Sequence, residues 1–435
     1  MPEVSAIPGN KDTFKKISRP NSLGKQMLNE KEKLQEIIRL SSEVTEINDL
    51  DLLLEKILAK ARTFANADAG SIYIKEGDQL KFSYSQNETL SKKLPSGKKL
   101  IYTSFVLPLN NQSIAGYVAN TGKILNLSDV YENPSNIPYG FSKNFDLVSH
   151  YRSKSMLTVP LKTTRGDIVG VLQMINAQDD EGNIISFSKD DEPLMAHFAN
   201  TAAIAIERAQ MTRAIILRMI SMAELRDPRE TGSHVNRVAS YSVEIFETWA
   251  KQQNLSRELI DEKRDVLRLA AMLHDVGKVA ISDLILKKPA RLNQNEYEVM
   301  KRHTFLGARL FANPKSEFDG AALDVALNHH EHWDGTGYPG FLDLFTGQPL
   351  AGFDDGNGRP RPKRGEEIPI FGRVVGLADV YDALSSSRSY KESWEEAKVL
   401  GIIQQESGKH FDPAMVEAFF SCLEVIHVIK KQYPD

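Results

Sequence analysis

The sequence predicts a multidomain protein: an α+β domain, built as an antiparallel sheet flanked by helices, is followed by an all-α domain, and a long helix joins them. Its 435 residues suffice for two or three domains of ordinary size. Within residues 28–210, segments with the apolar period of strands lie between segments with the period of helices. Residues 223–435 are almost wholly helical in pattern, except for a stretch rich in Gly, Pro and Asp at 335–369.

The chain begins with a polar segment, residues 1–27, which contains three prolines and which we expect to be flexible. From Met27 to about Ala67, apolar residues recur at spacings of three and four, which is typical of helix. The α+β domain therefore begins with helical structure.

Two strand pairs are predicted inside this domain. The stretch GSIYIKEGDQLKFSYS reads as two strands joined by a turn at Gly77-Asp78, and SMLTVPLKTTRGDIVGVLQMIN reads as two more, joined at Arg165-Gly166-Asp167. Between the pairs, SIAGYVANTG has the pattern of a short helix. This order of helix, strands and helix gives the α+β domain its predicted extent of 28–210.

The helix that closes this domain has no obvious end, because neither Gly nor Pro occurs between residues 194 and 227. We assign residues 197–226 as a connecting helix. Its apolar residues form one stripe, with steps of 7, 4, 4 and 3: Ile204, Met211, Ile215, Met219 and Met222. Such a stripe suits the seam of a two-stranded homodimer, and it also suits packing on the helix's own domain.

Composition excludes several classes of protein. The formal charge of −4 argues against a binder of nucleic acid polymers, and a single cysteine, Cys422, excludes an internal disulfide and a thiolate zinc cluster. No apolar run is long enough for a membrane span, and the N-terminus lacks the apolar core of a signal peptide. A cytoplasmic location is the simplest expectation, and any metal must be held by His, Asp and Glu.

Six of the ten histidines lie between His234 and His332, in or beside helical patterns. His274-Asp275 and His329-His330 are adjacent pairs, and neighbours on a helix diverge by about 100°, so each member of a pair would serve a different ion. This arrangement indicates a cluster of two or more ions. The candidate ligands are Glu230, His234, His274, Asp275, His303, His329, His330 and Asp379.

A lone histidine is more often an ordinary core or surface residue than a ligand. The combination is more specific, because LAAMLHDVGK places His274 and Asp275 directly after an apolar run, where burial without a partner is costly. Nitrogen and oxygen ligands suit iron, with manganese as the alternative, and zinc stays compatible. Two ions about 3.5–4 Å apart activate water and neutralise phosphate charge, so the expected chemistry is phosphodiester hydrolysis.

The stretches HDVGK, from His274, and HHEHWDGTGYP, from His329, resemble the HD-GYP family of cyclic di-GMP phosphodiesterases. The resemblance implies an all-helical catalytic domain over 223–435 that binds two or three divalent ions through the eight candidates above. Glu230, four residues before His234, resembles the third-metal variant of the family. Asp275 and Lys278 are then the predicted catalytic residues.

The same resemblance implies the substrate contacts. Lys278 would contact cyclic di-GMP at its phosphate. Tyr338, Asp382 and Ala383 would border the nucleotide, and Arg388 and Lys391 would bind the phosphates. The chain departs from the family after Gly340, where residues 341–368 form a longer connection. That loop puts substrate preference and rate in doubt more than metal chemistry.

Residues 28–210 resemble a GAF domain in AGSIYI, SIAGYVANTGKILNLSDV, SMLTVPL and GVLQMINAQ. Asn176 and the run from Phe187 to Glu192 match part of the signature of cyclic-nucleotide-binding GAF domains, but Ala177 stands where that signature has Lys. Such a domain binds a small molecule or only dimerises. We therefore expect a cyclic di-GMP phosphodiesterase regulated by a GAF domain, the alternatives being a non-catalytic cyclic di-GMP reader and an HD hydrolase of another nucleotide.

Overall fold

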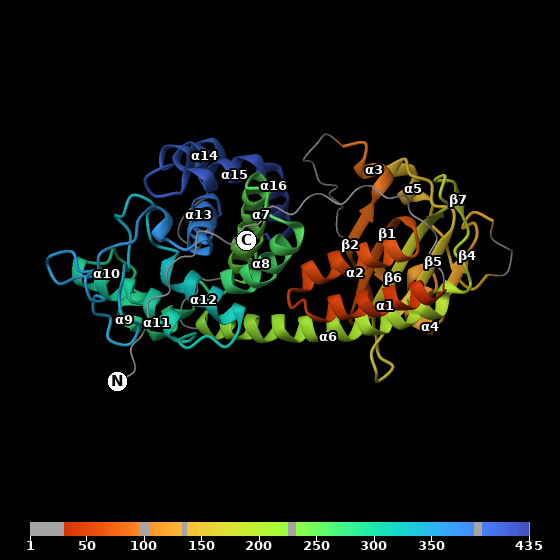
Figure 1. Cartoon of the computed structure of the whole chain (residues 1–435), viewed down its shortest axis with the longest axis horizontal. Coiled ribbons are helices and arrows are strands. Elements are labelled where there is room, and N and C mark those ends of the chain that lie inside the picture. The colour runs from red at the N-terminus through yellow and green to blue at the C-terminus, as the bar shows by residue number, and fades with distance from the viewer. Residues whose placement is uncertain (1–29, 95–104, 133–136, 225–231, 387–393, 435) are drawn as a thin grey trace.

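The computed structural model describes residues 30–94, 105–132, 137–224, 232–386 and 394–434. The described chain forms two bodies side by side, an N-terminal one with a sheet and a C-terminal one of helices, and one long helix runs along both (Figure 1). The predicted α+β domain followed by an all-α domain is confirmed.

The N-terminal domain contains a curled antiparallel sheet in the order β3-β2-β1-β6-β5-β4, with β7 paired to β6. The strands are β1 (Ala67–Glu76), β2 (Gln79–Asn87), β3 (Val106–Pro108), β4 (Leu125–Leu127), β5 (Met156–Lys162), β6 (Ile168–Gln178) and β7 (Ile184–Ile185). The two predicted strand pairs are therefore confirmed as β1–β2 and β5–β6. Gly77, with φ of 60°, makes the first turn.

Helices cover both faces of this sheet. They are α1 (Glu30–Thr45), α2 (Leu50–Phe64), α3 (Glu88–Ser91), α4 (Ile114–Thr121), α5 (Asn144–Ser149) and α6 (Asp191–Glu224). Ile72 and Leu172 point to the core shared with α1, α2 and α6, whereas Tyr73 and Val171 point to the opposite core, which α4 covers. Alternate residues of one strand thus serve two separate cores.

The helical pattern predicted from Met27 to Ala67 forms, over its described residues from Glu30 on, two helices, α1 and α2. Asp49 accepts a hydrogen bond from Leu52 N–H and so caps α2, while the Asp265 carboxylate of the C-terminal domain accepts from the Asn48 and Asp49 N–H groups. These backbone groups are satisfied by side chains rather than by a continued helix. Apolar periodicity does not detect such a break.

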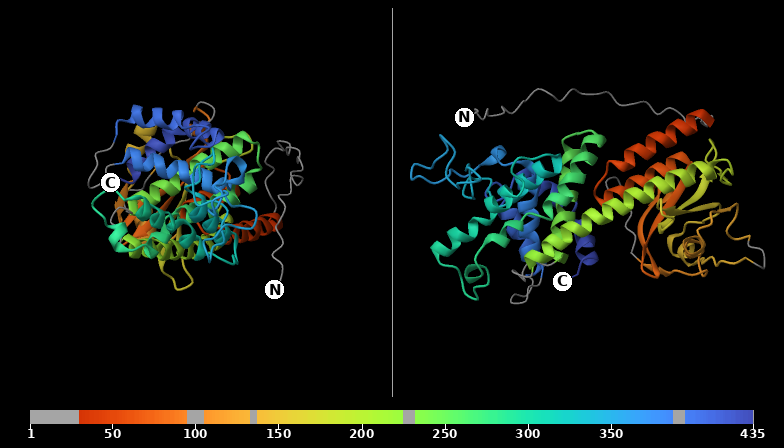
Figure 2. Two further views of the ribbon diagram at one scale, coloured as in Figure 1. Left: turned by 90° about the vertical axis from the view of Figure 1, so that its left-hand side faces the viewer. Right: turned by 90° about the horizontal axis from the view of Figure 1, so that it is seen from below.

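Helix α6 is 34 residues long and runs parallel to α1 before it passes along the C-terminal domain (Figures 1 and 2). One face of it packs into the N-terminal core through Phe198, Ala202 and Ile206. Four of the five residues of the predicted stripe lie on the other face: Ile204 is 43%, Met211 66%, Ile215 46% and Met219 41% exposed, while Met222 falls outside the described side chains. Packing on its own domain therefore does not account for these four residues.

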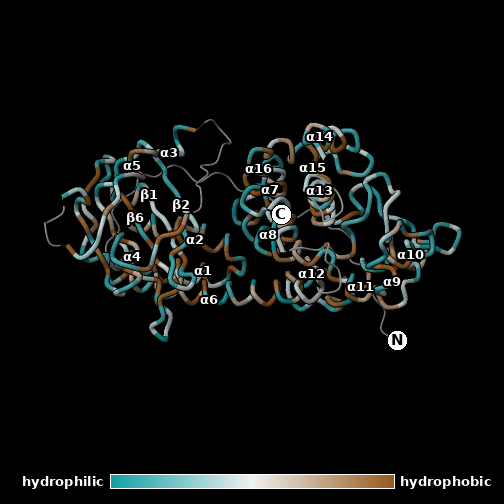
Figure 3. The backbone as a smooth tube through the Cα atoms, turned by 180° about the vertical axis from the view of Figure 1, so that it is seen from behind, coloured by the Kyte–Doolittle hydropathy of each residue, from teal (hydrophilic) through white to brown (hydrophobic). Residues whose placement is uncertain are grey.

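The C-terminal domain is helical, with one main hydrophobic core and a smaller cluster around Ala326. Its elements are α7 (Gly232–Gln252), α8 (Arg257–Ala271), the 3-10 helix η1 (Val276–Ala280), α9 (Asp283–Leu286), α10 (Gln294–Lys301), α11 (His303–Arg309), α12 (Glu317–Asn328), the 3-10 helix η2 (Gly365–Glu367), α13 (Ile370–Ser385), α14 (Glu396–Gln405), α15 (Pro413–Ser421) and α16 (Leu423–Gln432). Tyr241, Leu269, Val325 and Tyr381 lie in this core. Apolar segments recur throughout the helices, as the hydropathy colours of Figure 3 show.

The two domains meet through charged side chains where α2 faces α8. Arg268 of α8 lies 3.0 Å from Asp49 and also pairs with Asp51, and Arg264 lies 3.2 Å from Glu55. In a third pair the charges are exchanged between the helices, because Lys56 of α2 pairs with Asp261 of α8. Charges of both signs from both domains therefore interdigitate at this contact.

Within the part of the chain that the structure describes, no helix combines the length and hydropathy that crossing a membrane requires.

Candidate metal centre

The predicted ligands that the structure describes all lie on the C-terminal domain, mostly at helix ends. His274 and Asp275 follow α8, His303 opens α11, and His329 and His330 follow α12, whereas His234 and Asp379 lie within α7 and α13. Helix ends bring side chains from distant parts of the sequence to one point. His274, His303 and His329 are buried, each 2% exposed or less.

Two glycines allow the close backbone approaches that the centre needs. A Cβ on Gly277 would lie 1.9 Å from the carbonyl oxygen of His303, so only glycine permits η1 to lie against α11. A Cβ on Gly376 of α13 would lie 2.6 Å from the carbonyl oxygen of His329. These two contacts fix the separations within two pairs of ligand-bearing segments, η1 with α11 and the end of α12 with α13.

The ligands form two groups. The first group contains Asp275, His303, His329 and His330, and the second contains His234, His274 and Asp379. Within each group, one candidate ligand atom per residue lies within 4.8 Å of the others. In the first group the Nε2 atoms of His303 and His329 are 3.4 Å apart, and in the second the His234 Nε2 lies 3.6 Å from Asp379 Oδ1.

Asp275 lies between the groups. Its Oδ1 is 3.1 Å from His303 Nε2 and 3.7 Å from His329 Nε2 in the first group, while its Oδ2 is 3.3 Å from His274 Nε2 in the second. The two oxygens of one carboxylate thus face different groups. This is the arrangement expected of a carboxylate shared by two ions.

The electrostatics of Asp275 favour its charged form. Burial alone would raise the pKa of its carboxyl, but the positive charge of Lys278, 2.7 Å away, and the neighbouring imidazoles His274 and His303 hold it well below its usual range. Burial lowers the pKa of His329, and burial together with the His329 ring lowers that of His330 well below its usual value. A carboxylate beside the neutral imidazoles of His329 and His330 is the protonation state that a metal ion requires.

The outer nitrogens of the imidazoles are held by hydrogen bonds. The Nδ1–H groups of His274, His303 and His329 donate to backbone carbonyls of Ala271, Met300 and Val325, at 2.9, 2.8 and 3.0 Å. These bonds direct each Nε2 lone pair to the centre, as in metal-binding histidines. The donor set of nitrogens and carboxylate oxygens therefore fits divalent ions.

Tyr338 and Lys301 border the first group, and Lys278 lies at Asp275, between the two groups. Tyr338 stacks on His330 with ring centroids 4.9 Å apart, and Lys301 lies 5.3 Å above the Tyr338 ring. Lys278 reaches the centre through Asp275 Oδ2. Tyr338, Lys301 and Lys278 therefore all lie beside the ligand groups.

Asp382 differs from its expected place at the border of a nucleotide. It is 1% exposed, and its carboxylate accepts hydrogen bonds from His234 Nδ1–H at 2.8 Å and from Arg237 at 2.6 and 3.0 Å. Burial alone would raise the pKa of Asp382, but the hydrogen bonds from His234 and Arg237 outweigh it and lower the pKa. The carboxylate is buried behind a ligand and does not face an open pocket, because α13 turns residues 379 and 382 to adjacent positions of one face.

Ala383 is partly exposed on the same helix. Glu230, Arg388 and Lys391, predicted as a ligand and as phosphate contacts, lie outside the described residues. Sequence reasoning missed Arg237, although its spacing of three from His234 places both on one face of α7 and could have indicated it.

The long connection 341–368 is anchored beside the first group. Arg309 of α11 donates to the carbonyls of Leu344 and Phe345, both at 2.9 Å, and Lys363 Nζ donates to Asn328 at the end of α12 at 2.6 Å. The Arg361 guanidinium lies 4.8 Å from the Phe341 ring and 5.4 Å from that of Phe353. The loop is thus tied to the two helices that supply His303 and His329.

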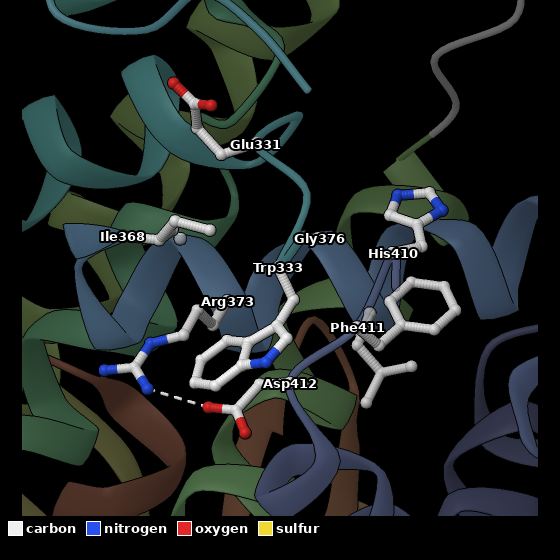
Figure 4. Close-up of a pocket in the computed structure, with 10 residues that line it drawn as sticks. Glu331, Trp333, Ile368, Arg373, Gly376, His410, Phe411 and Asp412 are labelled. Carbon is white, nitrogen blue, oxygen red and sulfur yellow. Dashed lines mark hydrogen bonds and ion pairs between the residues drawn. The ribbon is translucent and has the colours of Figure 1, made fainter. Parts of the chain in front are cut away.

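A small pocket is lined by residues of α13, by Glu331 and Trp333, and by residues 410–412 (Figure 4). Arg373 and Asp412 form an ion pair of 2.7 Å beside the Trp333 ring. The backbone N–H of Trp333 donates to the His410 carbonyl at 3.1 Å. These contacts hold the segment after His330 in place and supply no further candidate ligand group among the described residues.

Fold and site together define the class. The HD domain model matches residues 231–384, a second HD domain model matches 354–415, and the GAF domain model matches residues 49–206. The chain therefore combines a GAF domain with an HD domain, a fold of divalent-metal binding, and this confirms the predicted domain types.

Relatives with known names are similar to a little more than half of this chain. A protein of Vibrio cholerae serotype O1 named cyclic di-GMP phosphodiesterase is 38% identical over 57% of this chain and 48% of its own length. One of Thermotoga maritima with the same name is 35% identical over 51% of each chain. A third, named 3′3′-cGAMP-specific phosphodiesterase 2, from Vibrio cholerae serotype O1, is 32% identical over 53% of this chain and 39% of its own. The chain thus spans about half the length or less of these relatives.

Proposed function

We propose that this protein is a metal-dependent phosphodiesterase that hydrolyses cyclic di-GMP and that its GAF domain regulates it. The observation that carries the proposal is the position of Asp275, whose two oxygens face two separate groups of imidazole and carboxylate ligands. The names of relatives 35–38% identical over half the chain support the substrate.

Divalent ions at this centre would supply an activated water and would neutralise phosphate charge. The chain's own residues hold and orient the reactants. Asp275 joins the two ligand groups, Lys278 places a cation beside the scissile phosphate, and Tyr338 offers an aromatic face next to His330. Water adds to phosphorus, the bond to O3′ breaks, and O3′ takes the proton, which yields linear pGpG.

We propose iron as the metal, with manganese as the alternative, because the ligands are imidazoles and carboxylates without thiolate. Two groups of described ligands support two ions. A third ion, held with the help of Glu230, is part of the proposal, and it would allow further cleavage of pGpG to GMP.

The test is metal analysis and product analysis on one anaerobically purified sample. The wild-type protein is expected to carry two or three ions per chain and to convert cyclic di-GMP to pGpG or GMP. Asp275→Ala is expected to lose both metal and activity. A metal-loaded wild type that leaves cyclic di-GMP intact would refute the activity, and the same sample then tests the reader function by equilibrium binding.

A hybrid cyclic dinucleotide is the second candidate substrate, favoured by the relative named for 3′3′-cGAMP. Competing hydrolysis of 3′3′-cGAMP and cyclic di-GMP by one enzyme sample ranks the two by kcat/KM. A ratio above ten in favour of 3′3′-cGAMP would replace the first proposal.

We infer that the protein is a homodimer whose seam is the exposed stripe of α6. Ile204, Met211, Ile215 and Met219 lie on one face of α6, and Leu34 and Ile38 of the parallel α1 are 49% and 57% exposed. Four exposed apolar residues in one line indicate a contact surface. Ile215→Glu should convert the dimer to a monomer in light scattering, whereas Leu284→Glu, at an 86% exposed residue of α9, should not. A monomeric wild type would contradict the inference.

We further infer that the GAF domain binds a small polar molecule over its sheet. A row of polar side chains crosses four strands between two apolar clusters: Ser85, Ser71, Gln173 and Thr158. Ser71 and Gln173 are each 6% exposed. Asn176, in contrast, is occupied structurally, because its side chain bonds Lys154 N–H, the Arg152 carbonyl and Tyr151. The α2–α8 ion pairs offer the route by which GAF occupancy reaches the helix that precedes His274.

A further inference from the structure

His234 of the second ligand group begins a buried chain of three side chains, of which Asp382 and Arg237 have no role in the proposed reaction so far. His234 donates from Nδ1 to Asp382 Oδ2, and Arg237 clasps the same carboxylate with Nε at 2.6 Å from Oδ1 and Nη2 at 3.0 Å from Oδ2. The side chains of His234, Asp382 and Arg237 are 4%, 1% and 3% exposed. A bidentate pair of this kind is geometrically rigid.

The other ligating imidazoles are supported differently. His303 and His329 of the first group donate to backbone carbonyls, and so does His274 of the second. The Nδ1 atom of His234 instead has a carboxylate as its partner, whereas the Nδ1 atoms of these three have neutral carbonyls. The two groups therefore differ in the residues that support their ligands.

This difference has a chemical consequence. A carboxylate behind an imidazole makes Nε2 a more basic ligand than a carbonyl does, and it also fixes the ring. The Arg237 guanidinium compensates the buried negative charge of Asp382, which would otherwise be costly. Arg237 in turn donates to the Tyr433 carbonyl at 2.9 Å, and Lys430 of α16 donates to the Ser385 carbonyl, so the C-terminal helix holds this assembly in place.

We propose that Asp382 and Arg237 are positioning residues that selectively set the metal affinity of the second ligand group and leave the first group unchanged. The proposal rests on the proposed metal centre. It predicts two inequivalent metal positions, of which one depends on a carboxylate and a guanidinium that touch no ion. Loss of such a partner commonly weakens metal affinity about 10- to 100-fold.

The experiment uses Asp382→Asn, which keeps the size of the side chain and removes its charge. The full chain is stripped of metal and titrated with Mn²⁺ by calorimetry, and bound manganese is counted by elemental analysis. The expected result is the loss, or about 10- to 100-fold weakening, of one binding step per chain, with the remaining binding at wild-type affinity. Asp412→Asn is the matched control, because Asp412, the N-cap residue of α15, pairs at 2.7 Å with Arg373 of α13 and belongs to neither ligand group.

Each other outcome overturns the proposal or its basis. Unchanged Mn²⁺ binding in Asp382→Asn, or equal weakening of all binding steps, overturns selective positioning. A wild type that binds no Mn²⁺ or Fe²⁺ overturns the metal centre itself. If Asp382→Asn does not fold, Arg237→Lys, which keeps the charge but not the bidentate geometry, should show the same selective weakening. Failure of both to fold, with Asp412→Asn folded, would assign the pair to folding alone.

Discussion

Gly277 sets the distance between two metal-binding segments, so we expect Gly277→Ala to damage the centre from outside it. The added Cβ would lie 1.9 Å from the His303 carbonyl oxygen and 2.4 Å from the Gly307 nitrogen. Both neighbours are backbone atoms and cannot rotate aside. To restore an ordinary contact of 3.4 Å to the carbonyl, η1 and α11 must separate by about 1.5 Å.

That separation is large for a metal site. Ligand distances in such sites vary by only about 0.2 Å, and Asp275 and His303 lie on the two segments that would move apart. A displacement near 1 Å commonly costs about 100-fold in rate. Overpacking of this kind costs about 1–3 kcal/mol of unfolding free energy, here toward the upper value, which lowers Tm by roughly 6–12 °C for a domain of this size.

The assay compares metal content, thermal unfolding and cyclic di-GMP hydrolysis in wild type, Gly277→Ala and Gly320→Ala. Gly320 lies within α12, where an added Cβ meets no atom within 4 Å, so its replacement should stabilise the protein by about 0.5–1 kcal/mol and leave the metal in place. If Gly277→Ala kept full metal content and activity within twofold of wild type, the reasoning from the close contact would be refuted.

Three further outcomes are expected. Arg268→Met should lower the free energy of unfolding in urea by roughly 3 kcal/mol, the lower end of the usual range because Asp51 is partly exposed. Adding Asp49→Asn and Asp51→Asn should recover most of this lost stability. An Arg268→Met protein as stable as wild type would contradict a role for the ion pairs. Burial raises the pKa of Asp49 from 3.8 to about 6, so the folded chain binds that proton more tightly than the unfolded chain. As the pH rises from about 4 to 6, the free energy of unfolding should therefore fall by up to about 1.4 kcal/mol per pH unit. A plot of unfolding free energy against pH that is no flatter for Asp49→Asn than for wild type would contradict this. Chelation should lower Tm, and each Mn²⁺ site refilled at 100 times its Kd should restore about 2.7 kcal/mol; a Tm insensitive to chelator would argue against the metal centre.

Local patterns were sufficient for the order of the secondary structure. The strands around Gly77 and Gly166 and the short helix α4 were predicted because alternation, helical period and turn residues act over a few neighbours. The break between α1 and α2 was missed because the carboxylate that satisfies Asn48 and Asp49 belongs to Asp265, more than two hundred residues away.

The sequence by itself also determined which residue types could hold metal, since imidazoles and carboxylates are crowded between residues 234 and 379 with almost no thiol available. Only the tertiary structure divided them into two groups and placed Asp275 between them. It also moved Asp382 from the expected substrate border to the support of His234. Ligand type is a property of each residue, whereas ligand grouping depends on where helix ends meet, and contacts such as that of Gly277 with His303 are made only when the chain is folded.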